Sequence, residues 1–148
     1  MTGRLMLSGS CLCGKIGYAI DGGPRFMYQC HCSRCRAATG AAFATNLIVD
    51  TDRFTITAGK DSLCRLESSP GKFRYFCAGC GSPIYSHGEK TSHVVSVRSG
   101  TLRQDPGLRV AYHAFVASKA PWVEINDGLP QFDEYPDAAT VRKLMGSA

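Results

Sequence analysis

The chain has 148 residues, of which 44% are hydrophobic and 20% are charged, and its formal net charge is +5. These values are typical of one soluble domain, residues 1–148, that is long enough to bury a core. No apolar run approaches the ~20 residues of a membrane-spanning helix, and the first nine residues lack the apolar region of a signal peptide. The basic residues are scattered, so nucleic acid is not an expected partner. We therefore expect a cytoplasmic protein, in which clustered cysteines indicate metal binding or catalysis.

Short stretches of alternating apolar residues predict strands in the first part of the chain. Residues 15–20 place Ile16, Tyr18 and Ile20 on one side of a strand. A turn at 21–24 separates them from a second strand at 25–29. Residues 33–39 then predict one or two helical turns, with Ser33 as N-cap and Gly40 as the stop.

The remainder of the chain continues this pattern. Further strands are expected at 44–49, 53–57, 62–67, 72–76, 93–98 and 109–116. A loop with buried anchors follows at 127–136, and a last helix is expected from Asp137 to Met145, ending at Gly146. Many short strands separated by turns predict a mainly β domain.

Seven of the eight cysteines fall into three groups. These are Cys11-Leu12-Cys13, Cys30-His31-Cys32-Ser33-Arg34-Cys35 and Cys77-Ala78-Gly79-Cys80. A structural zinc site normally has four protein ligands, whereas a catalytic zinc site has three and an open position. The seven cysteines therefore divide into four plus three, and the predicted cofactor is Zn²⁺, with one structural ion and a second, catalytic one.

The two outer pairs predict the structural site. C-x-x-C is the usual zinc-knuckle spacing, and a shared ion would link the start of the chain to its middle. Such a site contributes folding free energy on the order of 10 kcal/mol. Reduced buried cysteines, or two redox pairs, are the alternatives, and they explain the spacing less well.

The central trio, Cys30, Cys32 and Cys35, leaves more than one possibility open. It predicts a three-thiolate zinc with a vacancy for water or substrate. A closed structural site is an alternative, with a fourth ligand among His31, His87, His93, His113 and Cys64. Three thiols without metal are another.

Three further residues carry expectations of their own. Cys64 is expected in the core as a small apolar residue. His113 lies in an apolar strand and is the histidine most worth attention. Trp122 predicts either a lid on the core or one wall of a ligand pocket.

Long motifs in this order resemble the glutathione-dependent formaldehyde-activating enzyme (GFA) family, which includes the centromere protein V domain. The resemblance runs from about 9 to 135, the expected core of the domain, with the helix at about 137–145 beyond it. It is carried by Gly9-Ser10-Cys11-Leu12-Cys13-Gly14, Cys30 to Arg36, Phe76 to Pro83, His113, Ser118 to Trp122 and Asp127 to Pro130.

The resemblance implies a zinc-stabilised, β-tent-like fold of several coiled antiparallel sheets with short helices. It also implies a structural zinc on Cys11, Cys13, Cys77 and Cys80, and a catalytic zinc on Cys30, Cys32 and Cys35. The reaction named for the family joins formaldehyde and glutathione to S-hydroxymethylglutathione, and its reverse is a carbon–sulfur lyase step. A small thiol such as glutathione is then the expected partner.

Candidate substrate-binding residues lie near the trio and in the later motif. Arginine binds carboxylates in bidentate fashion, and glutathione carries two, so Arg34 and Arg36 are the first candidates, with Arg25 and Arg74 as further ones. His31 and Trp122 complete the predicted set.

Three functions compete at this point. The first is a zinc-dependent carbon–sulfur lyase acting on a glutathione–aldehyde adduct or a related thiol. The second is a non-catalytic zinc-binding module that recognises a macromolecule, against which the lack of a basic block counts. The third is an enzyme of the same fold with another thiol or electrophile.

Overall fold

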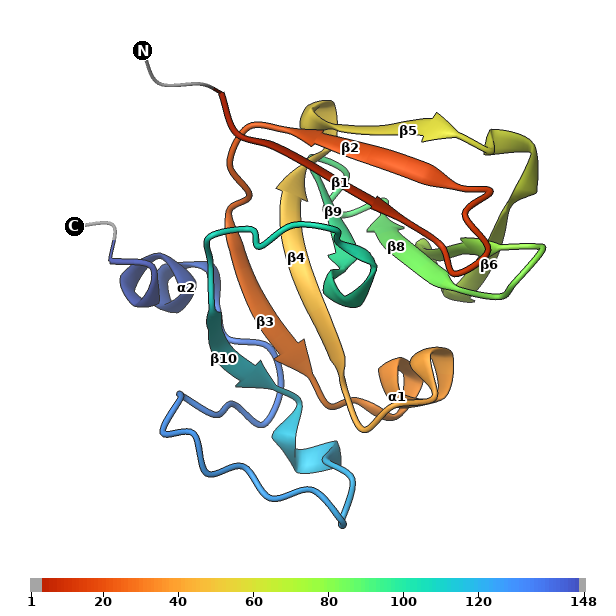
Figure 1. Cartoon of the computed structure of the whole chain (residues 1–148). Coiled ribbons are helices and arrows are strands. Elements are labelled where there is room, and N and C mark those ends of the chain that lie inside the picture. Colours follow the sequence, from red (N-terminus) through yellow and green to blue (C-terminus); the bar gives the residue numbers. More distant parts are fainter. Residues whose placement is uncertain (1–3, 147–148) are drawn as a thin grey trace. The chain divides into compact units, whose positions relative to one another are not determined.

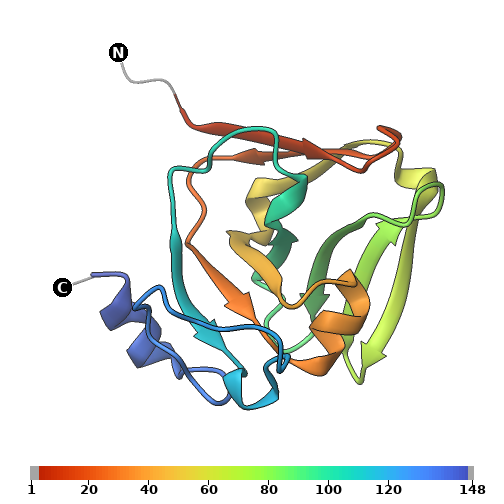
Figure 2. The same ribbon diagram turned by 60° about the horizontal axis from the view of Figure 1, so that its bottom comes forward.

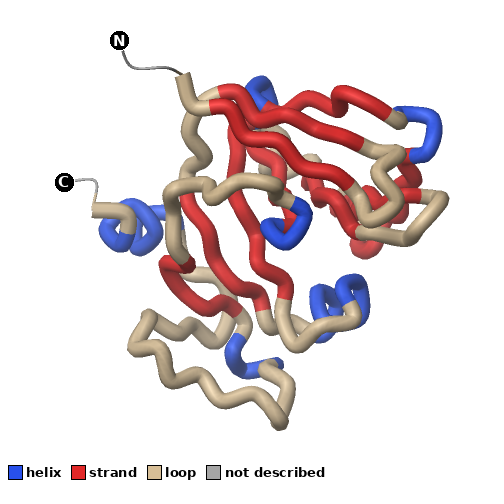
Figure 3. The backbone as a smooth tube through the Cα atoms, viewed as in Figure 1, coloured by secondary structure: helices blue, strands red, loops and turns tan. Residues whose placement is uncertain are grey.

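The computed structural model describes residues 4–146, and strands make up most of its regular structure (Figure 1, Figure 3). The strands form two sheets, and the α-helices and 3₁₀ turns are short. The described chain divides into two compact units. One contains the chain up to Arg25 together with Leu47–Leu108, and the other contains Phe26–Asn46 together with the chain from Arg109 onward. No helix within 4–146 has the length and apolarity needed to cross a bilayer.

The first unit contains a three-stranded sheet in the order β1-β2-β5. β1 (Met6–Ser10) and β2 (Gly17–Asp21) form an antiparallel hairpin, and β5 (Phe54–Ala58) pairs antiparallel with β2. Ile16, Tyr18 and Ile20 are buried, as their alternation predicts.

The same unit contains an antiparallel run of four strands. These are β6 (Leu63–Ser69), β7 (Lys72–Cys77), β8 (Pro83–Gly88) and β9 (Val94–Arg98), each paired with the next. The β7–β8 turn carries the second outer cysteine pair, so both outer pairs belong to hairpin turns of this unit.

The second unit is built on a parallel pair. β3 (Phe26–Cys30) lies beside β10 (Val110–Ala114), with Cys30 opposite Ala114 (Figure 1, Figure 2). α1 (Ser33–Thr39) follows β3 at once, and α2 (Ala138–Leu144) lies near the end of the described chain. Tyr28 and Tyr112 stack at 5.1 Å between ring centroids and anchor the pair. β4 (Ala44–Asp50) begins in this unit and ends in the first.

The mainly β prediction is confirmed, with differences at particular elements. Each strand expected at 15–20, 25–29, 44–49, 53–57, 62–67, 72–76, 93–98 and 109–116 is present, with ends displaced by up to two residues. β1 and β8 were not predicted, nor were the 3₁₀ turns at 51–53, 60–62, 99–101 and 116–118.

The N-terminus of α1 is capped by a different residue from the one predicted. The N-cap of α1 is Cys32 rather than Ser33, because the Cys32 sulfur accepts from the amide of Cys35. Gly40 ends the helix with φ 69°, as predicted. A trio member thus both caps the helix and belongs to the cysteine cluster.

Candidate metal centres

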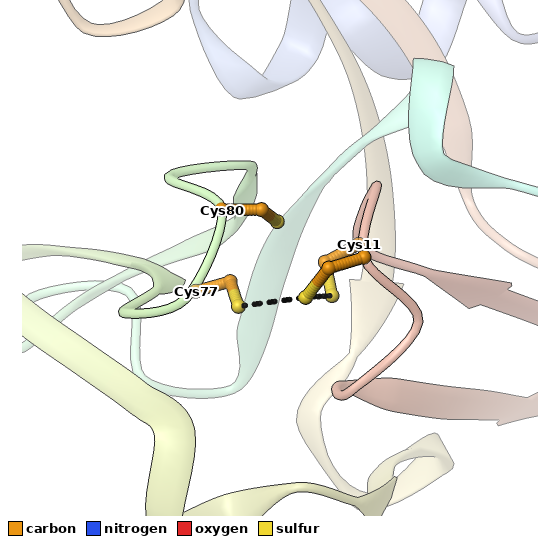
Figure 4. A group of neighbouring side chains, drawn as sticks. Cys11, Cys77 and Cys80 are labelled. Carbon is orange, nitrogen blue, oxygen red and sulfur yellow. Dashed lines mark hydrogen bonds between the residues drawn. The ribbon is translucent and has the colours of Figure 1, made fainter.

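Two hairpin turns bring four cysteines of the first unit together. Cys11 and Cys13 lie in the β1–β2 turn, Cys77 ends β7 and Cys80 lies in the turn before β8. Figure 4 shows Cys11, Cys77 and Cys80 with their side chains turned toward one another. The ligand atoms of all four cysteines lie within 4.8 Å of each other, so this quartet could hold a metal ion.

The sulfur spacing of the quartet fits zinc. Four sulfurs at about 2.3 Å from one ion, in tetrahedral arrangement, lie about 3.8 Å apart. The Sγ atoms of Cys11 and Cys13 are 3.6 Å apart, and those of Cys13 and Cys77 are 3.7 Å apart. All eight cysteines are free, so no disulfide competes for these sulfurs.

Backbone amides and one serine supply hydrogen bonds to the quartet. Ile16 N donates to Cys11 Sγ at 3.3 Å, and Gly79 N donates to Cys77 Sγ at 3.3 Å. The Ser82 hydroxyl, 3.2 Å from Cys80 Sγ, and the Ser82 amide lower the pKa of Cys80 to about 5. The lowered pKa of Cys80 favours its thiolate, which is the form that binds a metal.

The second unit holds the central trio at the β3–α1 junction. Cys30 ends β3, Cys32 caps α1, and Cys35 lies buried within the helix. Their sulfurs lie within 4.8 Å of one another, and no fourth His, Cys, Asp or Glu of residues 4–146 joins the group. Three close thiols without a fourth protein ligand are the donor set of an open zinc site.

The three thiols of the trio do not have equal proton affinities. Hydrogen bonds from Cys30 and Cys35, then from backbone amides, lower the pKa of Cys32 well below its ordinary range. Contact with Cys32 and Cys35, together with burial, raises the pKa of Cys30. Negative charge therefore concentrates on Cys32, which makes the trio suited to a cation.

A hydrogen-bonded row of side chains leads away from the trio within the second unit. His31 Nε2 lies 2.9 Å from His113 Nδ1, and His113 Nε2 lies 2.8 Å from Asp127 Oδ2. Burial, followed by the nearby His113, lowers the pKa of His31 to about 4. The hydrogen bond from His113, followed by that from the Leu129 amide, lowers the pKa of Asp127.

A family model described as "Glutathione-dependent formaldehyde-activating enzyme" matches residues 6–118 of this chain. The chain belongs to the GFA family. A relative from Podospora anserina is 35% identical over 82 residues, which are 54% of this chain and 38% of that relative. One from Aspergillus flavus is 31% identical over 77 residues, 51% of this chain and 40% of the relative. Both are provisionally named glutathione-dependent formaldehyde-activating enzyme, and the match spans about two fifths of their length.

The GFA fold is further supported by a solved structure. A crystal structure of a Rhodobacter sphaeroides protein covers 84% of this chain and 98% of its own, with a TM-score of 0.55 and 16% identity. Together with the two sheets, the short helices and two cysteine clusters that could bind zinc, this confirms the expected mainly β fold class.

The other predicted site residues of this GFA chain are dispersed. Arg34 is exposed on α1, and Arg36 donates from its Nη2 to the carbonyl of Ser118 at 3.2 Å. Trp122 is 74% exposed, so it is not a lid on the core. Arg25 pairs with Asp50 at 2.5 Å, and Arg74 donates from its Nε to Ser68.

Cys64 differs from its expected place in the core. It is half-buried and lies in β6, the edge strand of its sheet, which pairs with β7 alone among the described strands. It is also absent from both clusters among the described residues.

Sequence reasoning missed the role of Asp127. It lies in a motif that carries the family resemblance, but 96 positions of the chain, including α1 and every strand from β4 to β10, separate it from His31. A lone Asp-Gly pair in a loop indicates only a turn. His113 was singled out correctly, yet its two partners became visible only in the folded chain.

Proposed function

We propose that this chain is a zinc-dependent enzyme that makes and breaks the carbon–sulfur bond between formaldehyde and glutathione, or a closely related thiol. One observation carries the proposal: Cys30, Cys32 and Cys35 converge without a fourth protein ligand among residues 4–146. A purely structural site would be expected to have that fourth ligand, as the quartet does.

The proposed reaction balances without an added oxidant or reductant. In the lyase direction, the carbon–sulfur bond of S-hydroxymethylglutathione breaks and its electron pair stays on sulfur. The hydroxyl hydrogen leaves oxygen as the carbonyl of formaldehyde forms, and one proton ends on the glutathione sulfur. The addition direction reverses each change.

The residues of the trio would hold the ion by their thiolates, and hydrogen bonds from its neighbours lower the pKa of Cys32. Zinc bound there would supply a soft, electropositive position for the substrate's sulfur or for the carbonyl oxygen. The chain's own contribution is positional: β3 and the N-terminus of α1 fix the three sulfurs on one short segment.

The quartet has a different proposed role, as a structural zinc site. It ties the β1–β2 turn to the β7–β8 turn, two segments that are separated by 64 positions between Cys13 and Cys77. Closing so long a loop restricts the unfolded chain and stabilises the folded one. Its thiols, like those of the trio, need a reducing compartment, so a cytoplasmic location is part of the proposal.

Paired serine variants test the division of roles. Cys32→Ser should lower turnover of a formaldehyde–glutathione mixture by at least about 100-fold and remove one of two zinc ions per chain. Its melting temperature should stay close to that of the wild type. Cys77→Ser should instead unfold the protein, because the quartet loses a buried ligand and with it the ion.

Cys64→Ser is the matched control, since Cys64 is outside both clusters. Activity, zinc content measured by mass spectrometry, and thermal unfolding should all match the wild type. Equal destabilisation by Cys32→Ser and Cys77→Ser would contradict a catalytic trio and indicate two structural ions.

A same-fold enzyme with another thiol is the second candidate. The partners of two arginines favour this candidate. Arg36 donates to the Ser118 carbonyl and Arg25 is paired with Asp50, so neither side chain is free to bind the carboxylates of glutathione. Zinc-dependent activity with a small neutral thiol, but none with glutathione, would decide for this candidate.

A further inference from the structure

His31, His113 and Asp127 form a row of two hydrogen bonds from a partly exposed carboxylate to a buried ring. The Asp127 side chain is 45% exposed, whereas His113 and His31 are 3% and 0% exposed. His31 stands between Cys30 and Cys32 in the chain, so the buried end of the row is at the trio. The proposed reaction has not yet used any of these three side chains.

Asp127 determines which nitrogen of His113 carries a proton. A carboxylate only accepts hydrogen bonds, so His113 Nε2, at 2.8 Å from Oδ2, must be the donor. The other oxygen, Oδ1, accepts from the Leu129 amide at 3.1 Å, which holds the carboxylate in place. In a neutral His113 the remaining nitrogen, Nδ1, is then an acceptor.

The same reasoning extends one residue further. His31 Nε2 lies 2.9 Å from the accepting Nδ1 of His113, so it is the donor of that pair. A neutral His31 then carries no proton on Nδ1. That atom is buried and has no hydrogen-bond partner among the described residues. Buried polar atoms normally have a partner, so the missing one comes from outside the chain.

The backbone holds this row rigidly. The His31 amide donates to the Ala114 carbonyl at 2.9 Å, which ties the residue after β3 to the residue that follows His113 in β10. The His113 amide donates to Pro130 and its carbonyl accepts from Phe132, both at 2.9 Å. Phe43 packs against the His31 ring at 5.2 Å between centroids. A flipped His31 ring would lose the 2.9 Å hydrogen bond between its Nε2 and His113 Nδ1.

We propose that His113 and Asp127 are positioning residues, which hold His31 as its Nε2-protonated tautomer and so keep its Nδ1 lone pair for a polar hydrogen of the substrate. The proposal rests on the proposed function. The lyase step removes a hydrogen from the substrate's hydroxyl, and such a hydroxyl is the kind of donor that a lone pair accepts. The opposite tautomer would place an N–H at Nδ1, where it would repel the hydroxyl hydrogen of the substrate.

Nitrogen NMR of the zinc-loaded, full-length protein with ¹⁵N-histidine tests the assignment directly. In the wild type, His31 should be protonated on Nε2 and unprotonated on Nδ1. In Asp127→Asn, the amide can donate as well as accept, so a population with Nδ1 protonated should appear, as for an Asp→Asn change in a catalytic triad. Its kcat for the formaldehyde–glutathione mixture should fall roughly 10- to 100-fold, with KM within about twofold.

Two further variants separate positioning from folding. Asp127→Glu keeps the accepting carboxylate and should restore the wild-type tautomer and much of the kcat. Asp133→Asn removes an exposed carboxylate of the same segment and should change nothing. Zinc content and melting temperature should be equal in all four proteins.

Wild-type His31 protonated on Nδ1, or a tautomer unchanged in Asp127→Asn, would overturn the proposal. So would a kcat unchanged in Asp127→Asn when its tautomer has shifted. If the wild type has the expected tautomer but no activity on the mixture, the proposed function fails while the tautomer assignment stands.

Discussion

At the scale of single residues, sulfur acts as a hydrogen-bond acceptor that shapes the local backbone. The amides of Ile16, Gly79 and Cys35 each lie 3.3 Å from a cysteine sulfur of their own cluster. These bonds bend the chain around the thiols before any metal is considered. The capping of α1 by Cys32, where Ser33 was expected, has the same cause.

Gly9 has no room for a side chain, because Tyr18 and Thr101 lie close against its backbone. A Cβ at this position would lie 2.2 Å from the Tyr18 ring and 2.5 Å from the Thr101 carbonyl. The Tyr18 hydroxyl also bonds Thr101 Oγ1 at 2.7 Å, so the ring has little freedom to move. Gly9→Ala should therefore destabilise the fold by roughly 2 kcal/mol or more, measured by urea unfolding.

Gly23→Ala is the control for this substitution. Nothing lies within 4 Å of a Cβ built on Gly23, and its φ is not in the left-handed region. Its unfolding free energy should match the wild type or rise by a few tenths of a kcal/mol. If the two variants have the same free energy of unfolding, the close packing of Tyr18 against Gly9 is contradicted.

At the scale of elements, the ends of short strands and the turns between them supply most of the clustered cysteines, and the helices supply few. The outer cysteine pairs are supplied by the β1–β2 and β7–β8 turns, and the trio by the junction of β3 with α1. α1 contributes one buried residue, Cys35, whereas α2 contributes none. The last element therefore has no evident part in either cluster.

Ending the chain after Pro136 should leave the protein folded. This truncation removes α2 together with its N-cap, in which Asp137 accepts from the Thr140 amide at 2.7 Å. Because no residue of α2 is buried, the melting temperature should change by only about 2–4 °C, and the zinc content should not change.

A deeper truncation provides the contrast. Ending the chain after Asn126 removes Asp127 and the segment whose Phe132 amide donates to His113. This protein should lose stability and activity together. Equal behaviour of the two truncations would show that the second unit does not depend on the 127–134 segment.

At the scale of the molecule, each compact unit contains one cysteine cluster. The quartet lies in the unit with the three-stranded sheet, and the trio lies in the unit with the β3–β10 pair. A single domain over residues 1–148 stays a prediction, as do the roles of the two clusters. The membership of the GFA family does not depend on either.

Removal of metal should reveal how much of the stability comes from zinc. A structural zinc contributes on the order of 10 kcal/mol, and a whole domain is stable by only about 5–15 kcal/mol. A strong chelator should therefore lower the melting temperature by well over 10 °C, and added Zn²⁺ should restore it. A melting temperature that stays the same after the chelator is added would contradict a structural role for the quartet.

The sequence alone determined most of the strands, the helix at α1 and the membership of both cysteine clusters, because these depend on local patterns. A strand shows itself by apolar residues at alternate positions, and a zinc knuckle by the spacing of its cysteines. The mainly β fold and the two groups of thiols were predicted on that basis.

Only the tertiary structure decided what depends on partners distant in the chain. β1 has a weak pattern of its own and becomes a strand by pairing with β2, where Gly9 admits the Tyr18 ring. His31 and His113 are 82 positions apart, and no local pattern links them to each other or to Asp127. Strand pairing brings them together, because backbone hydrogen bonds fix the register in which side chains meet.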